Sequence, residues 1–174
     1  EGTLEPEHMF SLAKRNNVKI PFKNINEAKK AYNFSNLESF LKIYYEGAKV
    51  LLKEKDFFEL TWAYALKCKE DNIVHTEIFF DPQTHTNRGI SFDIIINGIY
   101  KALKKAEKEF GLSFKIIMCF LRHLTEEECF KILDQALIHK DKIVGVGLDS
   151  SEMGNPPKKF EKLFKKAIEN NFLT

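Results

Sequence analysis

The chain has few of the features that mark secreted, membrane-spanning or disulfide-stabilised proteins. Its three cysteines, Cys68, Cys119 and Cys129, show no Cys-x-x-Cys spacing, and this pattern favours buried free thiols in a reducing compartment. No apolar stretch reaches the length of a membrane span, and the first residues lack the basic and apolar regions of a signal peptide. We therefore expect a cytoplasmic protein.

Positively and negatively charged side chains are nearly equal in number. The sequence has 27 Lys and Arg against 25 Asp and Glu, a formal net charge of +2, so it offers no electrostatic footprint for nucleic acid or for an anionic membrane surface. It also has no Gly-x-Gly-x-x-Gly after an apolar run and no Gly-x-x-x-x-Gly-Lys-Ser/Thr, which disfavours dinucleotide and ATP chemistry. A small-molecule partner is the remaining expectation.

Three apolar runs, by contrast, each end in a dense cluster of polar residues. They are residues 73–80 followed by 81–89, residues 115–121 followed by Arg122 and His123, and residues 143–148 followed by 149–157. Nearly continuous apolar runs are typical of parallel strands that are covered by helices. Ligand groups in parallel α/β folds lie beyond the carboxyl ends of the strands. We therefore expect the three polar clusters to share one site.

The first 55 residues predict helices that precede this strand pattern. Pro6 suits the first turn of a helix that ends at Asn16 and Asn17. Ser35 and Glu38 have the spacing of a capping box that opens a second helix. That helix carries an apolar stripe, which could belong to the core or could close a pocket against water. The stripe consists of Leu37, Phe40, Leu41 and Tyr44.

From residue 56 onward, predicted helices and strands alternate. One helix begins near Asp56, and another follows Ser91 and is stopped by Gly111. The next opens with a capping box from Thr125 to Glu128, and the last covers about residues 157–170. Three strand–helix units with right-handed crossovers argue for a (β/α) barrel or a doubly wound sheet. A barrel needs eight strands and typically about 250 residues, so this chain is expected to be a piece of one.

The polar loops offer several candidate functional residues. Asp81, His85 and Arg88 crowd the first loop, where they could contact a substrate or serve only to hold the loop. His123, after Arg122, could bind a metal. It could equally orient a neighbouring residue, because the five histidines include no His-x-His or His-x-x-x-His spacing of the kind that metal sites use.

The third loop contains two consecutive serines, Ser150 and Ser151. Neither lies in a Gly-x-Ser-x-Gly elbow, so hydrogen bonding to a ligand fits these serines better than nucleophilic catalysis.

Taken together, four segments resemble the adenosine/adenine deaminase family of metal-dependent purine aminohydrolases, and the resemblance spans the whole chain. Residues 79–83 and 150–157 look more like the adenine deaminase branch than the adenosine branch. The four segments are residues 1–7, 77–89, 117–123 and 148–152.

The resemblance implies an α/β fold that is part of a (β/α)8 TIM barrel. The chain would supply about strands 2–4, with N-terminal and gating helices in residues 1–55 and three strand–helix units in residues 56–174. The family's catalytic zinc is held by motifs that would precede Glu1 and follow Thr174. On this resemblance the chain itself contains no catalytic residue and no metal ligand, and the segment alone should be inactive.

The resemblance also implies substrate contacts. Glu1 matches an acidic position that reaches the substrate, and Ser150 matches a strand-end position whose backbone meets the purine. The stripe of Leu37, Phe40, Leu41 and Tyr44 matches the gating helix. Residues around these contacts are expected to support them, namely Asp81, His85, Arg122, His123 and Glu152.

The implied reaction is zinc-dependent hydrolytic deamination of adenine to hypoxanthine and ammonia, a step of purine salvage. Glu1 stands where the adenosine branch has a shorter Asp, and the longer side chain would fill the space of a ribose, which favours the free base. Adenosine deamination is the alternative within the family. A non-catalytic purine-binding or structural barrel relative is the alternative from another class.

Overall fold

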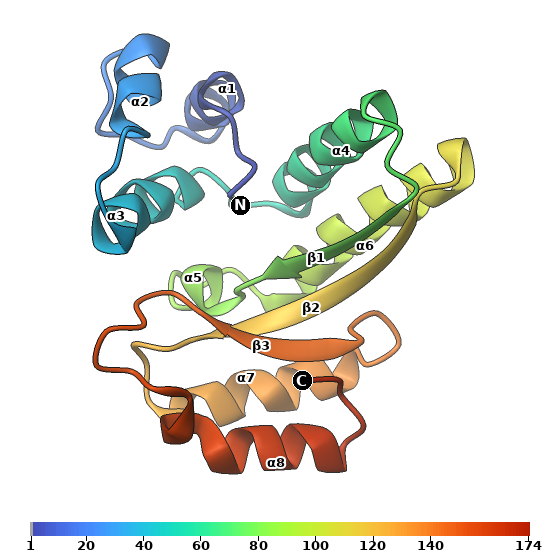
Figure 1. Ribbon diagram of the computed structural model, residues 1–174. Helices are drawn as coiled ribbons and strands as arrows, with labels where there is room; N and C mark the ends of the chain where they lie inside the picture. The colour runs from blue at the N-terminus through green and yellow to red at the C-terminus, as the bar shows by residue number, and fades with distance from the viewer. Residues whose placement is uncertain (1) are drawn as a thin grey trace.

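The computed structural model describes residues 2–174, so the predicted contact of Glu1 lies outside the described residues. Four helices precede the first strand, where the sequence predicted three, and helices then alternate with strands, as predicted (Figure 1). In chain order the elements are α1 (Pro6–Asn16), α2 (Ile25–Ala31), α3 (Leu37–Ala48), α4 (Glu54–Glu70), β1 (His75–Phe80), α5 (Gln83–Thr86), α6 (Phe92–Phe110), β2 (Ser113–Leu121), α7 (Glu126–Ile138), β3 (Gly145–Asp149), the 3₁₀ helix η1 (Pro157–Phe160) and α8 (Glu161–Glu169).

The strands form one parallel sheet in the order β1-β2-β3 within residues 2–174. The register pairs Phe80 of β1 with Met118 of β2, and Leu121 of β2 with Asp149 of β3. One parallel bridge joins Gly145 to Leu173 on the far side of β3. Because parallel strands end at the same edge of a sheet, the three polar clusters that follow them start from one edge. The predicted α/β class with parallel strands is confirmed.

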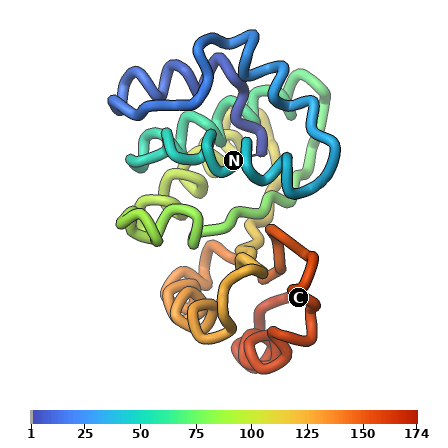
Figure 2. Tube along the Cα trace, turned by 90° about the vertical axis from the view of Figure 1, so that its left-hand side faces the viewer, coloured from blue at the N-terminus to red at the C-terminus, as the bar shows by residue number. Residues whose placement is uncertain are grey.

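Helices lie on two sides of the molecule, and α5, α6 and α7 pack against β2. Figures 1 and 2 show α1 to α3 gathered on one side of the molecule and α7 with α8 on the other. The core between them is formed by buried apolar side chains of the helices and strands. Its largest fully buried members are Phe57, Phe120, Phe160, Met9, Leu51, Ile95, Ile96, Leu103, Leu112, Ile116, Met118 and Leu133.

Helices α4 and α6 approach each other closely at Gly98. A Cβ atom at this position would lie 2.5 Å from the carbonyl oxygen of Glu54 and 2.7 Å from Cβ of Phe57. Only a residue without a side chain fits this contact, so Gly98 sets the distance between the two helices. Since Phe57 lines a cavity beside the sheet, this contact also places part of the candidate site.

Several local predictions are confirmed and one is wrong. Ser91 caps α6 and Gly111 ends it with φ 74°, and Thr125 and Glu128 form the predicted capping box of α7. The predicted box of Ser35 and Glu38 is wrong, because Asn36 is the N-cap. The Asn36 side chain accepts from the Ser39 N–H, and the Ser39 hydroxyl accepts from the Asn36 N–H.

The helix α2 and the four-residue helix α5 were not predicted. The cysteines Cys68, Cys119 and Cys129 are buried and free, as expected. None of the helices within residues 2–174 combines the length and apolarity needed to cross a membrane.

Candidate functional site

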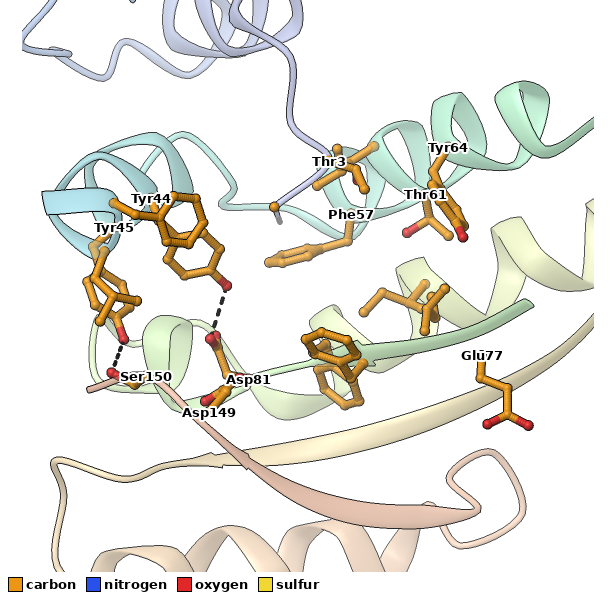
Figure 3. A pocket seen from close by; sticks show the side chains of 18 of the residues that line it. Thr3, Tyr44, Tyr45, Phe57, Thr61, Tyr64, Glu77, Asp81, Asp149 and Ser150 are labelled. Atoms are coloured by element: carbon orange, nitrogen blue, oxygen red, sulfur yellow. Dashed lines mark hydrogen bonds between the residues drawn. The ribbon is translucent and has the colours of Figure 1, made fainter. Parts of the chain in front are cut away.

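A cavity of about 450 Å³ lies between α3, α4 and the carboxyl edge of the sheet (Figure 3). Its walls are mainly apolar and aromatic, and polar side chains from the ends of β1 and β3 reach it. Volume and lining are those of a small-molecule site. The lining includes Leu37, Phe40, Leu41, Tyr44 and Tyr45 from α3, Phe57 from α4, Asp81 after β1, and Asp149 and Ser150 at the end of β3.

The apolar stripe of α3 forms one wall of this cavity. Leu37, Phe40, Leu41 and Tyr44 all line it, so the stripe faces a pocket, which was one of the two interpretations left open by the sequence. The Phe40 and Tyr44 ring centroids are 5.9 Å apart and those of Tyr44 and Tyr45 are 5.2 Å apart. Such aromatic contacts stabilise the wall as a unit.

Two consecutive tyrosines of α3 reach the ends of two different strands. The Tyr44 hydroxyl donates to Asp81 Oδ2 at 3.0 Å, and the Tyr45 hydroxyl lies 2.6 Å from Ser150 Oγ (Figure 3). Neighbouring helix residues point about 100° apart, which lets one helix turn contact both strand ends. Tyr45 was missed by the sequence analysis, and its position next to Tyr44 was the only available signal.

His85 was predicted to support substrate contacts, and it lies outside the cavity lining. The residue is fully buried in α5, and its ring packs edge-on against Phe57 with centroids 4.8 Å apart. Its Nδ1 accepts from the guanidinium of Arg88 at 2.7 Å. His85 therefore contacts the Phe57 ring, which lines the cavity, without lining the cavity itself.

Arg88, just after α5, ties this segment to the C-terminal end of α3 and to the residues that follow it. Its guanidinium donates to the carbonyl oxygens of Ala48, Lys49 and Leu51 at 3.0–3.3 Å. These carbonyls lie where a helix has unpaired acceptors and the negative end of its dipole, so an arginine is well suited to them. Arg88 anchors the C-terminal end of the cavity wall.

Arg122 and Glu152 organise the loop after β3. The Arg122 guanidinium donates to the Asn155 carbonyl oxygen at 3.0 Å and to Glu152 Oε1 at 2.9 Å. The main-chain N–H of Arg122 also donates to the Asp149 carbonyl oxygen. Asp81 and Ser150 both line the cavity, as predicted. Arg122 lies outside the lining and braces the loop after β3.

His123 touches the site through Ser150. Its Nδ1 lies 2.9 Å from Ser150 Oγ, and its ring packs edge-on against Tyr45 at 6.3 Å between centroids. Burial lowers the pKa of His123, and the positive charge of Lys159 acts in the same direction. A lowered pKa favours the uncharged imidazole near neutral pH.

Gln83 is a second residue that the sequence analysis missed. It is 2% exposed, and its Oε1 accepts from the Leu121 main-chain N–H at 3.0 Å. The side chain thereby joins α5 to the end of β2. Nothing in the sequence distinguishes Gln83 from the other polar residues of its loop, because burial is a tertiary property.

Among residues 2–174, no three or more His, Cys, Asp or Glu side chains are grouped so as to hold a metal ion.

A parallel sheet whose carboxyl edge borders a ligand-sized cavity defines the class of α/β proteins that bind or transform small molecules. The particular family follows from the sequence. Residues 1–174 match the model of the Adenosine deaminase family over their whole length. The chain belongs to this family, and the resemblance described above is confirmed.

Individual relatives agree with this assignment. An adenine deaminase of Acinetobacter baylyi is 60% identical over 99% of this chain, which covers 52% of that protein. The crystal structure of adenine deaminase from Arthrobacter aurescens superimposes with a TM-score of 0.94 at 43% identity, covering 98% of this chain and 52% of that one. The chain spans about half the length of the curated relatives it matches.

A more distant solved structure shares the fold. It is an amidohydrolase from Burkholderia ambifaria with bound Zn, and it superimposes with a TM-score of 0.85 at 22% identity, covering 98% of this chain and 47% of that one.

Proposed function

We propose that the whole protein is an adenine deaminase, which hydrolyses adenine to hypoxanthine and ammonia in purine salvage. The observation that carries this proposal is the 60% identity over 99% of the chain to a relative named adenine deaminase. The 43% identity and TM-score of 0.94 to a second protein of that name support it. In this proposal the present chain supplies walls of the substrate pocket.

The cavity suits a purine base in size and chemistry. Its volume of about 450 Å³ and its aromatic wall on α3 provide apolar surface for a flat ring. Asp81, Asp149 and Ser150 provide polar groups at the strand ends for the nitrogen atoms at the ring edge. We assign substrate contact to Glu1, Ser150 and the α3 stripe. We propose that the surrounding residues support these substrate contacts, namely Asp81, His85, Arg122, His123 and Glu152.

We further propose that the chain is about strands 2–4 of a (β/α)8 barrel, with the N-terminal and gating helices in residues 1–55 and three strand–helix units in residues 56–174. The metal is proposed to be zinc, with ligands outside these residues. Bound zinc would lower the pKa of its water so that hydroxide forms near neutral pH. A cytoplasmic location is proposed because the three cysteines are buried and free.

Ammonia release by the full-length protein tests the function. The zinc-loaded protein should release ammonia from adenine, and release from adenosine should be much slower because Glu1 is proposed to occupy the ribose space. Treatment with a chelator should abolish the activity, and added zinc should restore it. The opposite substrate preference would assign the protein to adenosine deaminases. A zinc-bound protein that acts on neither substrate would be a non-catalytic relative.

A further inference from the structure

Ser150 has an unusual backbone conformation for its residue type. Its φ angle is 72°, in the left-handed region, and the other non-glycine residues with positive φ within residues 2–174 are Asn17, Asn72 and Asn171. Asparagine adopts this region readily, whereas serine has no such preference. A residue persists in a sparsely populated conformation only where its surroundings hold it, and such residues cluster at functional sites. Ser150 also lines the cavity.

The side chain of Ser150 is held from two sides. Its hydroxyl lies 2.6 Å from the Tyr45 hydroxyl and 2.9 Å from Nδ1 of His123. Tyr45 comes from α3 and His123 from the loop after β2, so the anchors belong to different parts of the fold. The edge-on contact of the Tyr45 and His123 rings fixes the two anchors relative to each other.

Both contacts of the Ser150 hydroxyl lie within the protein, and the donor and acceptor in each depend on the tautomer of His123. Burial lowers the pKa of His123. With an uncharged ring whose Nδ1 accepts, Ser150 O–H donates to His123 Nδ1 and Tyr45 O–H donates to Ser150 Oγ. In that arrangement the one hydrogen of the serine hydroxyl is used within the protein. The side chain is thus an anchor, and it is the main chain of Ser150 that remains for a ligand.

We propose that Tyr45 and His123 are positioning residues that hold Ser150 in its left-handed conformation, so that its main chain has the geometry required to bind the purine. This inference rests on the proposed function. Because Tyr45 belongs to the same helix turn as Tyr44, the geometry at the end of β3 depends on how α3 is docked. Neither residue needs to touch the substrate for this role.

The test compares variants of the full-length, zinc-loaded protein. Tyr45→Phe keeps the ring and removes the hydroxyl, and Ser150→Ala removes the anchored group, so each should raise the KM for adenine about five- to tenfold with a smaller effect on kcat. Ser150→Gly should raise KM less than Ser150→Ala, because glycine adopts positive φ without an anchor. For the same reason, Tyr45→Phe should have less than about a twofold effect in the Ser150→Gly background.

Tyr32→Phe is the matched control. It removes a tyrosine hydroxyl that donates to the Leu4 carbonyl oxygen at 3.4 Å, outside the lining of the cavity, and it should leave the KM for adenine unchanged.

Three results would overturn the inference. Equal losses in Ser150→Gly and Ser150→Ala would mean that the hydroxyl itself is needed by the substrate. An undiminished effect of Tyr45→Phe in the Ser150→Gly background would mean that Tyr45 acts independently of the serine conformation. A lower Tm in Tyr45→Phe with an unchanged KM would mean a structural role alone. Absence of ammonia release from adenine by the unmodified protein would instead refute the proposed function, and the inference with it.

Discussion

The hydroxyl of Tyr44 donates a hydrogen bond of 3.0 Å to Asp81 Oδ2 and so joins the middle of α3 to the end of β1. Asp81 is 3% exposed, and both residues line the cavity. A hydrogen bond to a charged, buried acceptor is stronger than one between neutral groups at the surface. The wall of the proposed purine pocket is therefore attached to the buried aspartate that follows β1.

Replacement of Tyr44 by phenylalanine tests this attachment. The variant keeps the ring contacts and loses a bond worth roughly 1.5–3 kcal/mol, so the KM of the full-length protein for adenine should rise at least about tenfold. Steady-state kinetics measure this change. Tyr100→Phe on α6, outside the lining of the cavity, is the control and should behave as the unmodified protein does. An unchanged KM in Tyr44→Phe would show that the bond does not shape the pocket.

Arg88 should be sensitive even to a conservative substitution. Its planar guanidinium donates to three carbonyls at the end of α3, and the point charge of a lysine cannot reproduce this geometry. We expect Arg88→Lys to lower the free energy of unfolding by about 1–3 kcal/mol, measured by urea denaturation. Amide hydrogen exchange should accelerate in the last turn of α3.

Lys101→Met provides the comparison for Arg88→Lys, because the ion pair of Lys101 with Glu54 is largely exposed and worth at most about 1 kcal/mol. Equal losses in the two variants would contradict the anchoring role of Arg88.

Gly98→Ala tests the close contact of α4 and α6. Alanine is the better helix former by about 1 kcal/mol, yet its Cβ would lie 2.5 Å from the Glu54 carbonyl oxygen. Overpacking of this kind costs about 1–3 kcal/mol, so we expect net destabilisation in thermal unfolding.

Gly47→Ala is the matched control for that substitution. A Cβ at Gly47 would meet Met9 Sδ at 3.6 Å, an ordinary contact, and this variant should be neutral or more stable. A Gly98→Ala protein as stable as Gly47→Ala would refute the steric argument.

The buried carboxylate of Asp56 should make the free energy of unfolding depend on pH in the acid range. Its carboxylate is fully buried and accepts from the main-chain N–H groups of Leu52 and Lys53 and from the side chains of Arg15 and Asn16. Burial alone would raise its pKa, but these hydrogen bonds to the charged form outweigh burial and lower it. The stabilisation is then fully present above the ordinary pKa of the unfolded aspartate, about 3.9, and is lost as the pH falls through the folded-state value.

Asp56→Asn should accordingly lower the free energy of unfolding near neutral pH, by about 3 kcal/mol. The difference from the unmodified protein should shrink as the pH falls below about 4. Urea titrations at several pH values measure both effects. A difference that stays constant down to about pH 2 would contradict the assigned pKa shift.

Local signals were sufficient for much of the architecture. Ser91, Gly111 and the pair of Thr125 and Glu128 act within one turn of their own helices, so their roles could be read from neighbours in the chain. The alternation of apolar and polar segments likewise predicted the parallel sheet and placed Asp81 and Ser150 at one edge. At residues 35–39, several residues can cap a helix, and there the prediction chose Ser35 and Glu38 where Asn36 and Ser39 perform the role.

Contacts between distant segments could not be predicted in this way. The carboxylate of Asp56 bonds to Arg15, 41 residues away, and Tyr45 meets Ser150 across 105 residues. The type, order and polarity of the helices and strands depend on interactions among residues that are neighbours in the sequence. The sequence pattern therefore predicts them. Which tyrosine reaches which strand end, and which polar side chain is buried, depends on the packing of whole helices against the sheet.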